Sequence, residues 1–119
     1  MKEKRLEKYL QTRYKRELER YLNRIVGFAR QEGKEKEAFR AYEKRMREKL
    51  AEAEKKDLHS EYYTLLERFV ETAANLAEGE GKMEEIRDRI LHEANQIRKA
   101  KRKRTYNRKQ NGNAFDEEF

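Results

Sequence analysis

Apolar residues recur every three or four positions over most of the chain, which is the period of one face of an α-helix. The first of these stripes begins at Leu6 and continues to Ala29. Read together, the stripes predict four helices, over residues 3–31, 35–56, 58–78 and 82–104. The third stripe is the richest in apolar residues, so we expect the third helix to lie at the centre of the core.

Few residues interrupt this pattern, because the chain has no proline and only five glycines. Gly33 follows the first stripe and is expected to act as a C-cap or hinge. Gly79 and Gly81 separate the third helix from the fourth, and one of them can adopt a left-handed cap. Asp57 and Ser60 are candidate N-caps of the third helix.

These elements predict an all-α protein in which three to four long amphipathic helices form helical hairpins or a bundle. With 119 residues the chain fits one domain. We expect a helical domain over 1–104 and a flexible tail, first basic and then acidic, over 105–119. Apolar residues make up only 35% of the chain. A core this thin predicts completion by a homo-oligomer or by a helical protein partner.

Several chemical classes lack the residues that they require. There is no cysteine, which excludes disulfides, thiol nucleophiles and cysteine-ligated zinc. The two histidines, His59 and His92, have no partner at a metal-binding or catalytic spacing, and position 96 is glutamine where a zinc protease helix would carry its second histidine. The only serine, Ser60, has no nucleophile-elbow setting. We therefore predict no catalytic residues, no metal site, no cofactor and no enzymatic activity.

No apolar run reaches the length of a signal-peptide core or a membrane span. The expected location is the cytoplasm or a nucleic-acid assembly, a virion being one case, and no membrane partner is expected.

Charge is distributed unevenly around the net value of +7. Residues 1–34 hold 11 basic and 5 acidic residues, and 82–110 hold 11 and 4. The segment between them is much less basic, and 58–81 holds only 1 basic residue against 5 acidic ones. Two basic blocks that flank a neutral to acidic middle indicate a polyanionic partner.

In the first basic block, arginines recur at spacings of three and four, which places them in a row beside the apolar stripe. These candidate nucleic-acid-binding residues are Arg13, Arg16, Arg20 and Arg24. Like charges at i,i+4 destabilise an isolated helix, and a row of guanidinium groups fits successive phosphates. The alternative is an ordinary solvated face that Glu17 and Glu19 partly neutralise.

The stronger signal is the segment 98–109, which has eight basic residues and no acidic one. Its candidate nucleic-acid-binding residues are Arg98, Lys99, Lys101, Arg102, Lys103, Arg104, Tyr106, Arg108 and Lys109. The basic side chains would neutralise phosphates, and the Tyr106 ring would stack on an unpaired base. A disordered solubilising tail, a nuclear-import signal and a membrane-surface segment are the alternatives, the last without bulky apolar anchors.

The chain ends in Phe115, Asp116, Glu117, Glu118 and Phe119. This segment resembles the acidic, phenylalanine-terminated tails of single-stranded-DNA-binding proteins, although it lacks their penultimate proline. The resemblance implies a tail that docks a partner protein and competes with nucleic acid for the basic surface. A terminus without a partner is the alternative.

The sequence thus predicts a nucleic-acid-binding protein that contacts the phosphate backbone of DNA or RNA without sequence readout. One concrete form is a genome-packaging or virion coat nucleoprotein. The alternative is a helical interaction or assembly adaptor whose acidic, phenylalanine-bearing tail docks elsewhere.

Overall fold

A computed structural model describes the backbone of residues 2–110 and the side chains of residues 4–102. It contains four α-helices and, within the described residues, no strand. The helices are α1 (Lys2–Ala29), α2 (Lys36–Leu50), α3 (Glu61–Glu78) and α4 (Met83–Gln110). The predicted all-α class is therefore confirmed.

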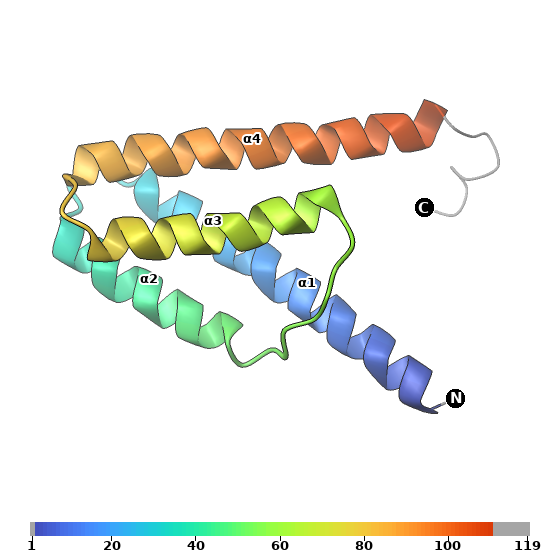
Figure 1. Cartoon of the computed structure of the whole chain (residues 1–119). Helices are drawn as coiled ribbons and strands as arrows, with labels where there is room; N and C mark the ends of the chain where they lie inside the picture. Colours follow the sequence, from blue (N-terminus) through green and yellow to red (C-terminus); the bar gives the residue numbers. More distant parts are fainter. Residues whose placement is uncertain (1, 111–119) are drawn as a thin grey trace.

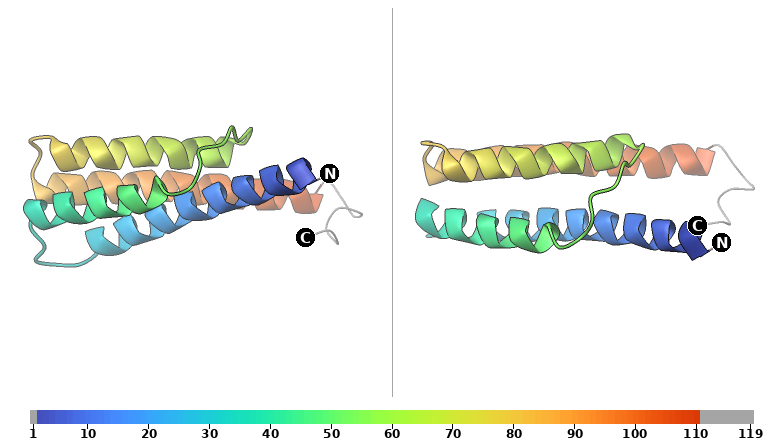
Figure 2. Two further views of the ribbon diagram at one scale, coloured as in Figure 1. Left: turned by 90° about the horizontal axis from the view of Figure 1, so that it is seen from below. Right: turned by 60° about the horizontal axis from the view of Figure 1, so that its bottom comes forward.

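The four helices pack in two layers, with α1 beside α2 and α3 beside α4 (Figure 1 and Figure 2). Both α1 and α3 contact each of the other three helices, so the architecture is a helical bundle. The N-terminal end of α1 and the C-terminal end of α4 lie at the same end of the bundle (Figure 2).

The core is built from the predicted apolar stripes. Leu18 and Ile25 of α1, Leu66 of α3 and Ile90 of α4 are each almost completely shielded from solvent. Tyr21 meets Phe69 edge to face, with ring centroids 6.1 Å apart. α3 packs on every other helix, as the third stripe predicts, but α1 does so too, and the two helices share the central position in the core.

Three tyrosines tie the helices together through buried or half-buried glutamates. In each pair the tyrosine hydroxyl donates a hydrogen bond to a carboxylate on another helix. The pairs are Tyr14 with Glu67 at 2.6 Å, Tyr21 with Glu43 at 2.6 Å, and Tyr62 with Glu19 at 2.8 Å. These bonds satisfy polar groups that the narrow core would otherwise leave unpaired.

Some basic residues hold the ends of neighbouring helices. Arg87 of α4 donates from Nε to the carbonyl of Ala29 at 2.7 Å and from a terminal nitrogen to that of Gln31 at 3.0 Å. Arg40 of α2 donates to the carbonyl of Ala77 at 2.8 Å. The last carbonyls of a helix lack partners within it, and cations there also complement its dipole. Part of the positive charge is thus structural.

The helices differ from the predicted boundaries at their junctions. α2 ends at Leu50 rather than 56, because residues 51–53 form a turn in which Ala53 N–H donates to the Leu50 carbonyl at 3.0 Å. Although it lies in this turn and not in a helix, Ala53 is buried. α3 begins at Glu61 instead of 58, and Leu58 is half-buried in the segment without regular structure that precedes it. A buried apolar residue does not by itself extend a helix.

The fourth helix also departs from the predicted organisation. It continues to Gln110, across the boundary at residue 104 where we expected the helical domain to end. The rest of the predicted tail, 111–119, lies outside the described residues. The division into a helical domain and a flexible tail stays a prediction.

Glycine acts at the two predicted breaks in different ways. Gly33 has a φ of 75°, which confirms its place in the turn after α1. Gly79 has φ −79° and ψ −173°, so the predicted left-handed cap at 79–81 is wrong. A Cβ at Gly79 would lie 3.0 Å from the carbonyl oxygen of Asn75, so this close approach favours glycine at the end of α3.

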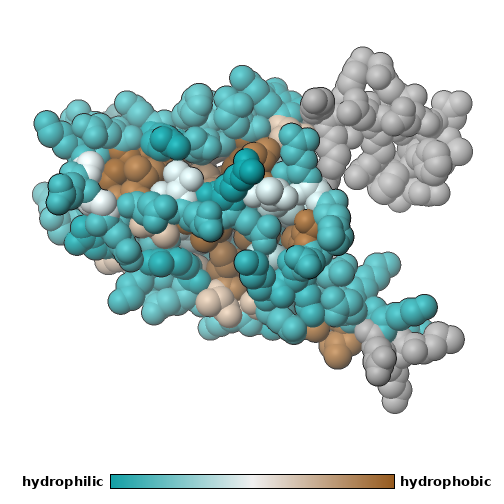
Figure 3. Space-filling view, viewed as in Figure 1, coloured by the Kyte–Doolittle hydropathy of each residue, from teal (hydrophilic) through white to brown (hydrophobic). Residues whose placement is uncertain are grey.

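Ser60 precedes α3 in an extended conformation, as an N-cap does, but its side chain makes no capping hydrogen bond. None of the helices in the described part of the chain is long and apolar enough to cross a bilayer. Hydrophilic residues cover most of the face in Figure 3, with apolar side chains visible between them.

Candidate nucleic-acid interface

The arginine row predicted on the first helix lines an open groove between α1 and α2. The groove has a volume of about 490 Å³. Its lining residues are Tyr9, Thr12, Arg13, Arg16, Glu17, Arg20, Arg24, Lys49 and Glu52. All four predicted arginines are exposed, and with Lys49 they outnumber the two carboxylates. We call this feature the α1–α2 groove.

The cations of the groove differ in how far the protein neutralises them. Arg20 pairs with Glu17 at 2.6 Å across one helical turn. Arg24 lies against the sulfur of Met46 at 3.9 Å. Arg13, Arg16 and Lys49 have no acidic partner among the described side chains. The groove therefore keeps a positive excess directed at solvent.

The second predicted basic segment lies on α4. Its described members, Arg98, Lys99, Lys101 and Arg102, are all exposed. The Lys101 ammonium lies 3.6 Å from the Glu19 carboxylate and 5.8 Å from the centre of the Tyr62 ring. Lys101 is therefore already paired with groups of the bundle.

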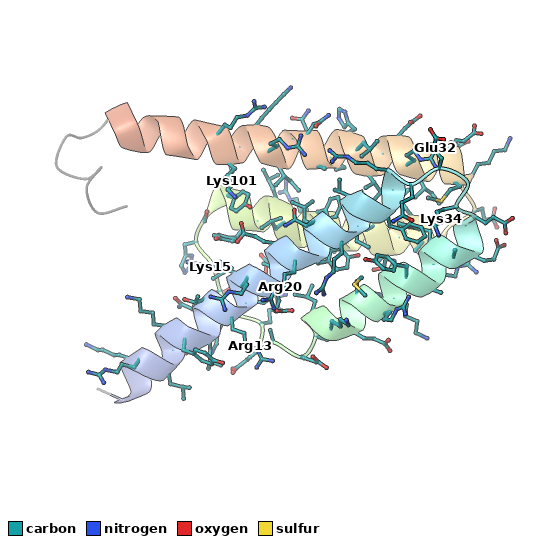
Figure 4. The ribbon with its side chains drawn as sticks, turned by 180° about the vertical axis from the view of Figure 1, so that it is seen from behind. Arg13, Lys15, Arg20, Glu32, Lys34 and Lys101 are labelled. Carbon is teal, nitrogen blue, oxygen red and sulfur yellow. The ribbon has the colours of Figure 1, made fainter. Side chains whose placement is uncertain are left out.

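Arg98 and Lys101 also line a smaller hollow of about 290 Å³ between α1 and α4, together with Arg30, which directly follows the last residue of α1. The structure does not bring the two predicted segments into one groove. Seen from behind, α1 crosses the front of the molecule with α4 above it and α2 below it, and Arg13, Arg20 and Lys101 all belong to this side (Figure 4). The arginine row thus lines the side of α1 that borders α2, and the basic residues of α4 lie on the side of α1 that borders α4.

The other predicted site residues belong to the C-terminal part of the chain. Lys103, Arg104, Tyr106, Arg108 and Lys109 belong to the helical backbone of α4, but their side chains lie outside the described residues. The predicted docking residues lie wholly outside them: Phe115, Asp116, Glu117, Glu118 and Phe119.

Two lining residues that could contact a nucleic acid, Tyr9 and Lys49, are not among the residues predicted from the sequence. Tyr9 stands four positions before Arg13 and extends the arginine row by one turn, a spacing that is visible in the sequence. Lys49 comes from α2, and no pattern in the chain places it beside α1. Its position follows only from how the two helices pack.

Buried titratable groups lie in the bundle and not in the groove. Burial and the hydrogen bond to Glu43 raise the pKa of the Tyr21 hydroxyl far above its ordinary value. Burial and Glu67 raise the pKa of Tyr14 in the same way. Hydrogen bonds to Glu7 and Glu54 raise the pKa of Lys56. His59 and His92 are both exposed, and no three acidic or histidine side chains in the described part form a metal-binding group.

A scan against protein-family models, a search of curated proteins and a search of solved structures each gave no match to the chain.

Proposed function

We propose that the α1–α2 groove binds the phosphate backbone of a nucleic acid without reading base sequence. The observation that carries this proposal is the convergence of four arginines and Lys49 on one open groove, where Arg13 and Arg16 have no acidic partner among the described side chains. Phosphate contacts of this kind give affinity that is independent of sequence.

The electrostatics of the row favour an anionic ligand. Arg16 and Arg20, and Arg20 and Arg24, are like-charge pairs at i,i+4, each of which destabilises an isolated helix by a few tenths of a kcal/mol. A phosphate placed between two guanidinium groups replaces this repulsion with charge-assisted hydrogen bonds. Arginine offers a planar fork of donors that matches phosphate oxygens in a bidentate manner.

The shape of the row favours a polymer over a single anion. At 1.5 Å per residue, Arg13 and Arg24 lie about 16 Å apart along α1. One small anion reaches only one turn of such a helix, whereas a nucleic-acid strand carries charges along its whole length. We infer that Arg98, Lys99 and Arg102 on the other side of α1 extend the contact to further phosphates.

Binding at several salt concentrations tests the proposal. We expect wild-type protein to bind a fluorescent oligonucleotide with an affinity that falls steeply as salt rises. In Arg13→Gln/Arg16→Gln the slope of log affinity against log salt should be smaller by about 1.4 on a single strand, because two fewer phosphates are neutralised. Lys44→Gln/Arg68→Gln is the matched control, because it removes the same charge from two exposed residues that lie outside the groove.

No binding at low salt, or equal slopes for the groove variant and the control variant, would refute the proposal. The first result would show that no polyanion is recognised. The second would show that the net charge of the protein, and not the groove, produces the affinity.

A genome-packaging or coat nucleoprotein is one particular form of this function. It requires many copies along one nucleic acid, and the thin core and exposed basic faces are compatible with such an assembly. Light scattering with nucleic acids of increasing length tests this form: the number of protein copies bound should rise in proportion to length. One copy per nucleic acid at every length would exclude packaging, and a cytoplasmic or virion location stays a proposal that depends on this result.

An assembly adaptor is the second candidate function. Leu6 and Tyr9 of α1 are 57% and 59% exposed, respectively, and a helical partner would cover such side chains. Deletion of 110–119 separates the candidates. Loss of a protein partner with intact nucleic-acid affinity supports the adaptor, whereas tighter nucleic-acid binding supports a tail that competes for the basic surface.

A further inference from the structure

Tyr9 differs from every other tyrosine in the described part of the chain. Tyr14, Tyr21, Tyr62 and Tyr63 are buried in the bundle. Tyr42 is half-buried and stacks on a phenylalanine of the core. Only Tyr9 is exposed, with 59% of its surface open to solvent, and none of the described hydrogen bonds or ring contacts involves it.

The position of Tyr9 connects it with the arginine row. It lines the α1–α2 groove, four residues before Arg13, so that Tyr9, Arg13, Arg16, Arg20 and Arg24 follow one another along a single face of α1 at spacings of three and four. The face thus begins with an aromatic ring and continues with guanidinium groups for about 22 Å along the helix.

We propose that Tyr9 is a stacking platform for an unpaired base and that the α1–α2 groove therefore selects single-stranded nucleic acid. The inference rests on the proposed function, because the arginines must first hold the strand. It adds the class of nucleic acid that the same site prefers.

The physical argument compares what a strand and a duplex offer to the ring. In a duplex each base is covered above and below by its neighbours, so an exposed tyrosine ring finds only the sugar-phosphate exterior. In a single strand a base can leave the stack and lie on the ring, whatever its identity, since every base has an aromatic face. Leu6, one turn earlier and 57% exposed, adds apolar surface beside that position.

The combination also explains how the two kinds of side chain divide the work. Arginines bind phosphates of any nucleic acid, so they do not by themselves select a single strand over a duplex. The aromatic ring contributes only when a base is free. Specificity for single strands then comes from Tyr9, and affinity comes from the arginines.

Three ligands of equal length separate these contributions: a single-stranded oligonucleotide, the same strand with abasic sites throughout, and a duplex. Affinities are measured by fluorescence anisotropy for wild type, Tyr9→Ala and Tyr9→Phe. We expect wild type to bind the intact strand at least about 5-fold more tightly than the abasic strand. Tyr9→Ala should lose about 5-fold or more on the intact strand and nothing on the abasic strand, whereas Tyr9→Phe should bind like wild type.

The groove variant Arg13→Gln/Arg16→Gln is the matched control, and it should weaken binding to all three ligands. Because Tyr9 is exposed, its replacement leaves the core intact, which a thermal unfolding curve verifies. Unchanged binding of Tyr9→Ala to the intact strand, an equal loss on the abasic strand, or wild-type preference for the duplex would each overturn the stacking inference. The proposed function would survive those results. It would fail together with this inference if none of the three ligands were bound, or if Arg13→Gln/Arg16→Gln did not weaken binding to any of them.

Discussion

Glu43 is a carboxylate with no exposed surface, and its hydrogen-bond partners determine how far its burial destabilises the folded state. It accepts a hydrogen bond from the Tyr21 hydroxyl at 2.6 Å and another from Arg47 at 3.1 Å. A buried carboxylate without partners is strongly destabilising, whereas one that is fully hydrogen-bonded specifies how the helices pack. Here the hydrogen bond joins α1 to α2, the two helices that border the α1–α2 groove.

Removal of the Tyr21 hydroxyl should therefore be costly. We expect Tyr21→Phe to lower the free energy of unfolding by about 1–3 kcal/mol, because Glu43 keeps only Arg47 as a partner. Tyr14→Phe is the matched comparison: its partner Glu67 is half-buried and recovers water, so the loss should be smaller, about 0.5–1.5 kcal/mol. Urea unfolding measures both, and an equal or larger loss for Tyr14→Phe would contradict this account of Glu43.

Alkaline pH should destabilise the bundle through the same tyrosine. The pKa of Tyr21 is raised in the folded state, so the folded protein keeps the proton where the unfolded chain, with a pKa near 10, loses it. The stabilisation is complete below pH 10 and decreases above it, by about 1.4 kcal/mol per pH unit for this one group. Urea unfolding between pH 9 and about 11.5 measures the decrease.

Tyr21→Phe should reduce the loss of stability at alkaline pH without abolishing it, because burial and Glu67 raise the pKa of Tyr14 as well. If wild type and Tyr21→Phe lost stability equally as the pH rises, the buried hydroxyl would not be the responsible group.

The two glycines in and after α1 should respond to replacement by alanine in opposite ways. Gly33 has a φ of 75°, which side chains with a Cβ rarely adopt, so Gly33→Ala should destabilise the protein by about 1 kcal/mol. Gly27 lies within α1, and a Cβ there meets nothing within 4 Å. Gly27→Ala should therefore stabilise by about 0.5–1 kcal/mol. Thermal unfolding of both variants checks the signs, and a stabilising Gly33→Ala would contradict the turn geometry.

The periodic pattern was sufficient to predict the helices but not all of their ends. The spacing of the apolar stripes depends only on the helical period, so the number and order of helices followed from the sequence. Ala53 and Leu58 continue the pattern although neither lies in a helix, since burial requires only that a side chain face the core. Tertiary contacts, which the sequence does not display, decide where a helix stops.

The candidate site was predictable to a similar degree. Arg13 to Arg24 fall on one helix face by spacing alone, and the structure places them together. Lys49 and the groove itself require the packing of α2 on α1. Arg40 and Arg87 could not be assigned from the sequence either. They contribute to the positive net charge, but in the fold they donate hydrogen bonds to carbonyls at the ends of neighbouring helices.

For the whole molecule, the uneven distribution of charge has a structural counterpart. The acidic carboxylates that meet tyrosines lie inside or beside the core, and Arg13, Arg16 and Lys49 face solvent in one groove. The positive surface around α1 is thus what remains after internal pairing. This remainder is the basis of the proposed binding of a polyanion.

The most direct test of that claim is an NMR titration that follows the side-chain signals of the arginines during addition of a short single-stranded oligonucleotide at low salt. The account predicts the largest shifts for Arg13, Arg16, Arg20 and Arg24, and no shift for Arg45 and Arg68, which lie outside the groove. Shifts that are largest for Arg45 and Arg68, or equal for all exposed arginines, would contradict it.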